Sequence, residues 1–408
     1  MPPYIYPTGV TIYKPDKAYN CFVLFDGRDA RAHLIDMNGN NARIWNHLGF
    51  PAEMINPAIN KGKRGHVFVH QKGEELFANK TLLELDWDGN VVWEWGDKAP
   101  GGNANQNHDL ARLPNGNTLI VSYIEVKSDD ESRARRRQCI YEVAPEGQIV
   151  WTWIPAEHAD EFGYSEEVLA LIRARGSQLG MNDMDPLGPN KWYRAGDERF
   201  HPDNVLVGES HIAIIDKKTS KVVWVMPRDY PGMDESLKWV FNPSNHDAHM
   251  IPDGLPGGGN ILVFDNHGSA LFPPAYGSMW QANPSSRILE IDPIKKQLVW
   301  EYTAEHSLLP LWEFHSSFIS SARRLPNGNT LINEGMRGRM FQVTSEGEIV
   351  WEYVSPYYGK MGFGEWKRAA RANWVFRAQP IPYDWVPEGT SHSENPVTPP
   401  NVSEFHIR

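Results

Sequence analysis

The segment from residue 107 to residue 120 reads Asn-His-Asp-Leu-Ala-Arg-Leu-Pro-Asn-Gly-Asn-Thr-Leu-Ile, and most of it returns at residues 324–332 as Arg-Leu-Pro-Asn-Gly-Asn-Thr-Leu-Ile. A looser copy, His-Asp-Ala-His-Met-Ile-Pro, occupies residues 246–252 and continues through a glycine-rich loop into a second apolar stretch. An Asn-Gly turn between two alternating stretches is a strong β-hairpin signal. Each copy therefore predicts two strands joined by a tight turn, and two copies place a histidine at the start of the first strand.

A second recurring unit consists of an alternating strand, a polar turn and a strand that ends in tryptophan. Its six copies end at Trp45, Trp93, Trp151, Trp224, Trp300 and Trp351. Repeats of roughly 40–50 residues are typical of propellers and solenoids, and longer spacings indicate long loops between conserved units. Four strands per repeat favour a β-propeller.

Joining an inner hairpin to an outer hairpin gives a four-stranded blade. We expect five blades within residues 65–95, 107–153, 180–226, 245–302 and 318–353. The sixth blade would combine an N-terminal hairpin, residues 22–45, with an inner strand from the tail, residues 373–377. Such a closure removes exposed sheet edges. The prediction is an all-β, six-bladed propeller over residues 1–395, followed by a C-terminal arm, residues 396–408.

Composition limits the partners and the compartment. The 408 residues carry a formal net charge of -11, which disfavours nucleic acid and anionic membranes as partners. The two cysteines, Cys21 and Cys139, fit neither a disulfide framework nor a metal motif. No apolar run approaches the roughly 18 residues of a membrane helix, so we expect no membrane insertion. The N-terminal residues favour a cytoplasmic protein, or a periplasmic one if a signal peptide had been removed. The oligomeric state stays open.

The repeats resemble a known family. Hairpins reading His-Asp-x-x-x-Leu-Pro-Asn-Gly-Asn-Thr-Leu, with outer strands reading Gly-x-Ile-Val-Trp-Glu-Tyr, are similar to those of bacterial arylsulfotransferase-like propellers. The similarity extends from about Tyr6 to about Pro356. The resemblance implies six blades with histidines at the channel mouth. One histidine would take a sulfuryl group from a phenolic sulfate ester and pass it to a phenol, without a nucleotide donor.

The third blade departs from the pattern of that family. The family usually carries Trp-x-His-x-Asn-Ser before a Gly-Pro-Asn that matches residues 188–190. Here Gly180 takes the place of the histidine, whereas Asn182 is retained. A family Ser-Ser-Arg aligns with residues 208–210, which contain no arginine. The resemblance implies that both replaced groups would have contacted a sulfate.

The start of each inner strand is the predicted site. In a propeller these strands line the central channel, so the residues that open them should converge on one cavity. Histidine titrates near neutral pH and serves as nucleophile, base or acid. We expect His249 or His246 to act as nucleophile or base, with His108 as the acid–base partner. The residues expected to contact the substrate are His315, Asn182, Arg339, Tyr123 and Glu334.

Three functions fit this prediction. The first is sulfuryl transfer on a small phenolic or aromatic substrate, with no cofactor. The second is a lyase or hydrolase that uses the same histidines for acid–base or metal-assisted chemistry. Zinc or copper would suit an all-imidazole site, with calcium as a further possibility, and the ligands would be His108, His246, His249 and His315. The third is a non-enzymatic binding propeller, because a fold does not determine a function.

Overall fold

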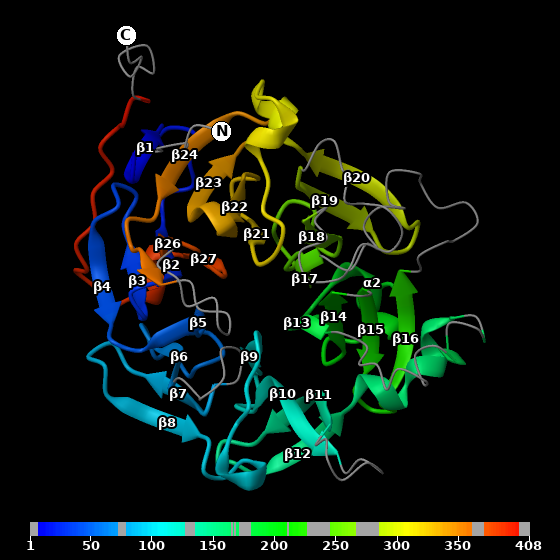
Figure 1. Cartoon of the computed structure of the whole chain (residues 1–408). Helices are drawn as coiled ribbons and strands as arrows, with labels where there is room; N and C mark the ends of the chain where they lie inside the picture. Colours follow the sequence, from blue (N-terminus) through cyan, green and yellow to red (C-terminus); the bar gives the residue numbers. More distant parts are fainter. Residues whose placement is uncertain are drawn as a thin grey trace.

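The computed structural model describes residues 7–71, 79–126, 135–164, 166, 169–170, 181–209, 212–226, 245–266, 285–360 and 371–399. Within these ranges six larger antiparallel sheets are arranged as blades around a central axis (Figure 1). The helices with described bounds are 3-10 turns and the four-residue α2 (Lys191–Arg194). The predicted all-β, six-bladed propeller is therefore confirmed.

The blades follow one another along the chain, and each inner strand lies at the axis. Blade one contains β5 (Leu48–Met54), β6 (Val67–Gln71), β7 (Thr81–Leu85) and β8 (Val91–Trp95). Blade two contains β9 (Leu110–Arg112), β10 (Thr118–Val126), β11 (Arg135–Val143) and β12 (Ile149–Trp153). Blade three contains β13 (Met181–Pro186), β14 (Val205–Glu209), β15 (Ile212–Asp216) and β16 (Lys221–Met226).

The remaining blades join the two ends of the chain. Blade four contains β17 (Asn245–Met250), β18 (Ile261–Asp265), β19 (Arg287–Asp292) and β20 (Gln297–Tyr302). Blade five contains β21 (Ser321–Arg324), β22 (Thr330–Glu334), β23 (Arg339–Val343) and β24 (Ile349–Val354). Blade six contains β27 (Ala378–Ile381), β2 (Phe22–Gly27), β3 (Arg31–Ile35) and β4 (Asn41–Trp45). A small separate ladder pairs β25 (Gly359–Lys360) with β26 (Arg371–Ala372).

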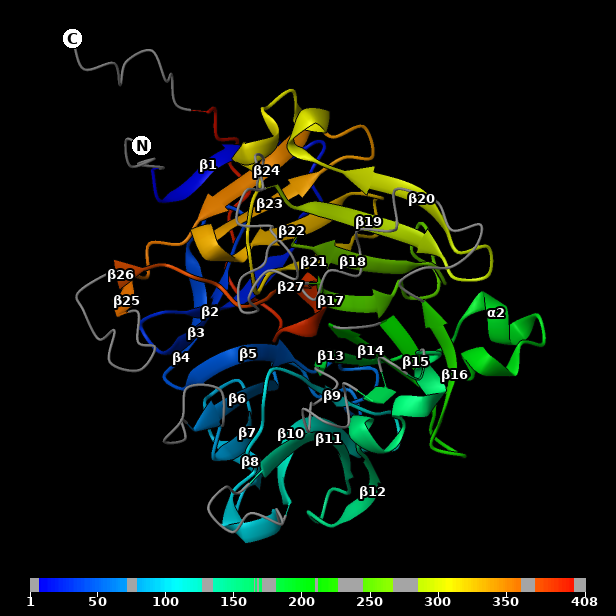
Figure 2. The same ribbon diagram turned by 45° about the vertical axis from the view of Figure 1, so that its right-hand side comes forward.

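Three details of the predicted blades were wrong. The inner strand of blade one, β5, precedes the predicted range 65–95, because its Gly-Phe-Pro sequence hides the alternation of a strand. The tail strand of blade six is β27 rather than residues 373–377, and it pairs with β2 from Phe22↔Ile381 to Phe25↔Ala378. Blade five has a fifth strand, because β1 (Gly9–Tyr13) pairs with β24. Figure 2 shows β27 near the axis, next to β21 and β17.

The hydrophobic core is divided among the blade interfaces. Six apolar clusters each join the facing sides of two neighbouring blades. Sheets covered on both faces are made of nearly continuous apolar strands, as in β15, whose first four residues are buried. The packing of blade against blade therefore fixes the position of every inner strand around the axis.

The tail continues across the outer surface after β27. Val397 forms an isolated β-bridge with Tyr13, in which the Tyr13 N–H donates to the Val397 carbonyl at 2.9 Å. Residues 400–408 of the predicted arm lie outside the described residues. Nowhere in the described part of the chain is there a helix with the length and apolarity needed to cross a membrane.

Candidate functional site

Each inner strand contributes one structurally equivalent residue to the central channel. These residues pair with a Leu or Phe at the same position of the second strand in every blade. The pairs are Glu53↔Phe68, Ala111↔Leu119, Asp185↔Leu206, His249↔Leu262, Arg323↔Leu331 and Gln379↔Leu24. We call Glu53, Ala111, Asp185, His249, Arg323 and Gln379 the channel ring. All six line one cavity of about 420 Å³.

The rest of this cavity wall is mostly apolar. Apolar lining residues beyond the inner strands are Tyr19 from the N-terminal region, together with Pro252, Leu255, Leu325, Pro326, Pro382 and Trp385. The cavity thus extends from the channel ring towards the end of the propeller at which the inner strands finish. A polar floor with apolar walls is typical of a small-molecule pocket.

Arg377 closes the floor of the cavity. Its guanidinium contacts both carboxylate oxygens of Asp109, at 2.7 and 3.0 Å, and lies 3.1 Å from Asp247. Arg323 binds the same Asp247 carboxylate at 2.6 Å. Arg377, Asp109 and Asp247 are buried, Arg323 is half-buried, and all four charges are paired, as the cost of removing ions from water requires. Two arginines and two aspartates therefore form one network at the floor of the cavity, and Arg323 joins this network to the channel ring.

The aspartates that follow the predicted site residues also connect the blades. The side chain of Asp109 accepts a hydrogen bond from the Met184 N–H at 2.9 Å. In the same way, the side chains of Asp183, Asp247 and Ser321 accept hydrogen bonds from backbone N–H groups of the next blade. The donors are Ala248, Ala322 and Ala378, respectively. Each bond joins one inner strand to the next. The Asp of the His-Asp motif is thus first a structural residue, which satisfies a buried N–H of the neighbouring blade.

The two ring nitrogens of His249 have different surroundings. Nδ1 lies 2.8 Å from the Asp247 carbonyl oxygen, and because a carbonyl only accepts, Nδ1 carries the proton. Nε2 is buried and has no hydrogen-bond partner among the residues that the structure describes. Burial holds the pKa of His249 well below its usual range, and Arg323 acts in the same direction. His249 is therefore a neutral imidazole with an unprotonated Nε2.

His246 uses both of its ring nitrogens to hold loops together. The Ile319 N–H donates to Nε2 at 3.0 Å, so Nδ1 is protonated and donates to the Asn266 side-chain oxygen at 2.6 Å. Burial lowers the pKa of His246 to about 4. Asn266 in turn donates to the carbonyls of Ser316 and Ile319. His246 therefore connects blade four with the segment that leads into blade five.

His108 lies at the start of the inner strands, away from the cavity lining. Its ring meets Phe376 and Phe50 edge-on, with centroid distances of 5.3 and 6.2 Å, and its Nδ1 contacts the side chain of Asn107. Asn107 also donates to the Tyr123 hydroxyl at 2.7 Å. Burial lowers the pKa of His108 to about 3, with His246 as the second cause.

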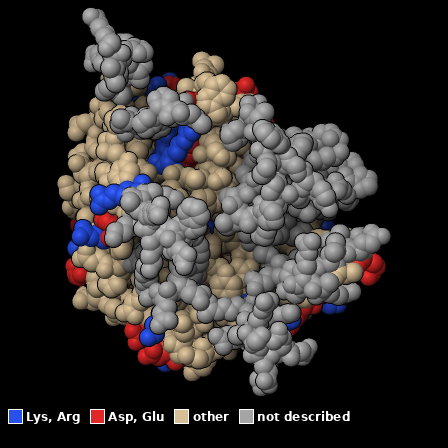
Figure 3. All heavy atoms as spheres, viewed as in Figure 1, with Lys and Arg blue, Asp and Glu red and all other residues tan. Residues whose placement is uncertain are grey.

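Figure 3 shows that the described surface around the axis on one face is mostly uncharged.

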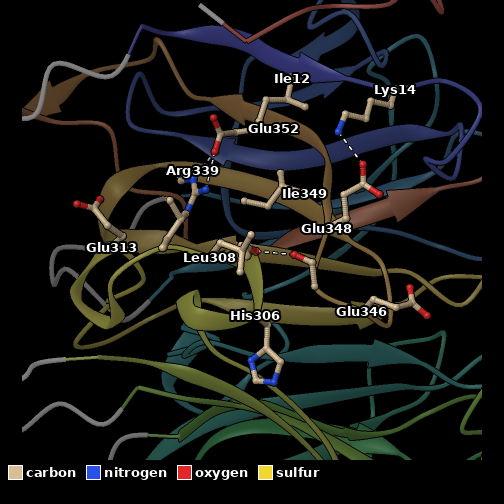
Figure 4. A pocket seen from close by; sticks show the side chains of 13 residues that line it. Ile12, Lys14, His306, Leu308, Glu313, Arg339, Glu346, Glu348, Ile349 and Glu352 are labelled. Carbon is tan, nitrogen blue, oxygen red and sulfur yellow. Dashed lines mark hydrogen bonds and ion pairs between the residues drawn. The ribbon is translucent and has the colours of Figure 1, made fainter. Parts of the chain in front are cut away.

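Arg339 and Glu334 belong to a different part of blade five. The Arg339 guanidinium binds Glu334 at 3.1 Å and Glu352 at 2.6 Å, and it lies over the Phe341 ring. Glu334 also accepts from the His315 N–H at 3.0 Å. Arg339 lines a separate cavity of about 660 Å³ between β1, β24 and the η7 turn (Ala304–Ser307) (Figure 4). The structure thus separates Arg339 from the channel cavity.

Of the eight predicted site residues, His249 alone lines the channel cavity. Asn182 lies at the bulge of β13, and its buried side-chain oxygen has no partner in the described part of the chain. Gly180 and Ser210, where the chain departs from the arylsulfotransferase pattern, lie outside the described residues. Their replacement therefore stays a prediction.

The sequence interpretation missed the charged residues of the cavity. Arg323 occupies the repeat position that Ala111 holds in blade two, so aligning the repeats would have singled it out. Glu53 lies in β5, and Arg377 directly precedes β27. The repeats did not reveal either of these inner strands. Burial raises the pKa of Glu53 to about 8 and that of Asp185 to about 6.

The described residues contain no group of three or more His, Cys, Asp or Glu side chains that could hold a metal ion. The four predicted ligands, His108, His246, His249 and His315, are not such a group. His246 already has a protein partner on each ring nitrogen.

Comparison with known proteins gives one sequence match and several distant structural ones. The model of the family described as arylsulfotransferase (ASST) matches residues 13–376. No curated protein matches the chain. A protein of unknown function from Bacteroides caccae is 14% identical, with a TM-score of 0.47, over 89% of this chain and 99% of its own.

Two further solved structures are similar at low identity. A streptogramin B lyase is 14% identical, with a TM-score of 0.36, over 72% of this chain and 66% of its own. The Cps50 (Swd1) β-propeller domain from Myceliophteria thermophila is 11% identical, with a TM-score of 0.41, over 91% of this chain and 97% of its own. The assignment to a family depends on the sequence match alone.

Proposed function

The chain belongs to the arylsulfotransferase family, and we propose that it transfers a sulfuryl group between phenolic oxygens, with His249 Nε2 as the carrier. The observation that carries this proposal is the state of His249. It is neutral, its Nδ1–H is fixed on the Asp247 carbonyl, and its Nε2 is unpaired in the described structure. A neutral imidazole with a free nitrogen is what nucleophilic catalysis by histidine requires.

The proposed reaction has two steps and needs no cofactor. In the first, the Nε2 lone pair forms an N–S bond while the ester S–O bond breaks, and the aryloxide leaves with the electron pair and takes up a proton. In the second, the oxygen of an acceptor phenol forms a new S–O bond, the N–S bond breaks and the phenolic proton is released. The Asp247 carbonyl would stabilise the positive ring in between, through the bond to Nδ1–H.

Arg323 is the cation best placed to meet the sulfuryl oxygens. It is the first charged residue among the causes that lower the pKa of His249, followed by Arg377 and Arg324. Its contact with Asp185, at 3.3 Å, is longer than its 2.6 Å contact with Asp247. Arg323 can therefore keep Asp247 and turn a second N–H to the substrate, where charge-assisted bonds are strongest.

The apolar wall of the cavity suits an aromatic ring. Tyr19, Leu255, Leu325 and Trp385 are among the residues that line the cavity. A ring bound there would direct its sulfate ester towards the channel ring. Burial of one aromatic ring supplies binding energy without using the charged groups that act on the sulfuryl group.

A second candidate function is acid–base catalysis by a lyase or hydrolase. The observation that favours it is that one cavity contains two titratable groups whose pKa values are shifted. Glu53, with a pKa of about 8, is a carboxylic acid at neutral pH, whereas His249 is an unprotonated base. Two titratable groups whose pKa values are shifted in this way can serve as acid and base.

An aryl sulfate assay tests the leading proposal. With para-nitrophenyl sulfate as donor, phenol should accelerate release of nitrophenol. With donor alone, mass spectrometry should find one SO₃ group on the peptide that contains His249. Transfer of the label to a different residue, or release of nitrophenol that does not depend on phenol, would contradict the role of His249 as carrier. The second pattern would favour hydrolysis.

A further inference from the structure

Glu53 is the exception among the charged residues of the channel cavity. Arg377 is paired with Asp109, Arg323 with Asp247 and Asp185, and Arg324 with Glu290 at 2.7 Å. Asp253, at the outer edge, is paired with Arg194 at 2.7 Å. For Glu53 there is no hydrogen bond and no ion pair with any residue that the structure describes. A carboxyl group without a protein partner is available to a ligand.

The position of Glu53 opposes that of His249. Glu53 comes from blade one and His249 from blade four, and in a ring of six blades these two face each other across the axis. The neighbours of Glu53 in the channel ring are Ala111 and Gln379, which are uncharged. Gln379 is also held on both the N–H and the carbonyl of Met54, at 2.7 and 3.1 Å.

The charged groups of the cavity act differently on His249 and on Glu53. On the His249 side, three arginines lower the pKa of the imidazole. For Glu53, Asp109 and Asp185 are the first charged causes that raise the pKa of the carboxyl group, and Arg377 and Arg323 lower it less. A cation bound beside Glu53 would lower the pKa of the carboxyl group and favour its ionised form, whereas an anion there would raise that pKa.

We propose that Glu53 binds a cationic group of the acceptor, so that the preferred acceptor is a small phenol with a protonated amine on its side chain. This inference rests on the proposed sulfuryl transfer. The sulfate would bind at Arg323 and His249, and the ammonium group would bind across the axis at Glu53. A cavity of about 420 Å³ accommodates a one-ring molecule with a short side chain.

Three acceptors of similar shape and different charge test the proposal. Tyramine, para-ethylphenol and para-hydroxyphenylpropionate share a phenol and carry a cation, no charge and an anion, respectively. Assays near the pKa of Glu53, about 8, keep the amine protonated. For the wild type, kcat/KM for tyramine should exceed that for para-ethylphenol by about tenfold, the equivalent of about 1.4 kcal/mol. In Glu53→Gln this ratio should fall to near one.

The control variant is Glu346→Gln, a change at the separate cavity of blade five. It should keep the wild-type ratio. Equal turnover of the three acceptors by the wild type, or an unchanged ratio in Glu53→Gln, would overturn the inference. The kcat/KM values of the wild type for the three acceptors test the inference even if Glu53→Gln folds poorly.

Calorimetric titration without a donor separates this inference from the proposed reaction. Tyramine binding that is lost in Glu53→Gln, in a protein that transfers no sulfuryl group, would support the cation site and reject the proposed reaction. Sulfuryl transfer with equal binding of all three phenols would support the reaction and reject the cation site.

Discussion

At the residue scale, two histidines of one motif have different surroundings. His246 and His249 are three positions apart on β17, and both are buried and neutral. His246 has a partner on each nitrogen, whereas His249 has a partner only on Nδ1 within the described residues. Hydrogen bonding, more than burial, distinguishes His246 from His249, the histidine proposed as the carrier.

Replacing each histidine by alanine should separate activity from stability. His249→Ala should lower sulfuryl transfer by a factor on the order of 10²–10⁴, since the carrier is removed. It loses one hydrogen bond to a carbonyl, worth about 1 kcal/mol in unfolding free energy. His246→Ala leaves Asn266 and the Ile319 N–H without their partner and should cost about 2–4 kcal/mol. Urea denaturation and the aryl sulfate assay measure both effects.

The reverse pattern would contradict this assignment. A His249→Ala protein that keeps its turnover but unfolds at much lower urea concentration would make His249 the structural residue. The Asn266→Ala variant removes the same contact from the other side, together with two bonds to the Ser316 and Ile319 carbonyls, so its loss of stability should be at least as large as that of His246→Ala.

The sequence predicted part of this site, and the physical reason for the rest is clear. His108 and His246 occupy the same position of the repeat, so their place at the start of an inner strand follows from the pattern. The partners of His246 come from residues 20 and 73 positions away. Such contacts depend on how the blades meet, and no local pattern reports them.

At the element scale, the closing strand shows where pattern reading fails. β27 reads Ala-Gln-Pro-Ile, and a proline inside a run argues against a strand. The strand is possible because β27 pairs with β2 alone and lies at the inner edge of its sheet. The outer hairpins, which end in Val-Trp or similar pairs, alternate regularly and were predicted from the sequence.

Asp26 of β2 fixes the segment that enters β27. Its Oδ1 accepts hydrogen bonds from the N–H groups of Phe376 and Arg377, at 2.9 and 3.4 Å. Burial raises the pKa of Asp26 to about 8, so the folded protein keeps a proton that the unfolded chain loses above its ordinary value of 3.8. Stability should therefore fall as pH rises between those values.

Asp26→Asn removes this dependence and keeps an oxygen acceptor. Relative to wild type, the variant should be stabilised more at neutral pH than at pH 5, with a difference of up to about 1.4 kcal/mol per pH unit in this window. Urea denaturation at several pH values measures it. A stability difference that is constant over the range, or one that grows towards acid pH, would show that Asp26 is ionised in the folded protein.

At the scale of the whole molecule, tryptophans connect the blades in a closed circle. The indole N–H of the outer strand donates to a carbonyl in the outer turn of the next blade. The bonds are Trp45 to Asp86, Trp95 to Gly147, Trp153 to Ser220, Trp224 to Pro293, Trp300 to Ser345 and Trp351 to Met37. The last bond joins blade five to the N-terminal hairpin of blade six, which closes the ring on the outside as β27 closes it on the inside.

This circle explains why tryptophan recurs with the repeat. A large apolar ring fills the interface between two sheets, and its single donor satisfies a carbonyl that would otherwise be buried without a partner. Loops of different length between the units do not disturb the contact, because it depends only on the outer hairpin. The position of the channel ring thus depends on contacts far from the axis.

Removing one indole donor from this circle should weaken the whole ring. Trp351 is fully buried, so Trp351→Phe keeps most of the apolar contact and leaves the Met37 carbonyl unsatisfied. We expect a loss of about 1–3 kcal/mol in unfolding free energy.

Trp300→Phe is the matched control, because its bond to Ser345 is solvent-accessible and water can replace it. Its loss should be below about 1 kcal/mol. Urea curves followed by circular dichroism measure both, and equal losses would mean that packing, rather than the indole bond, holds the blades together.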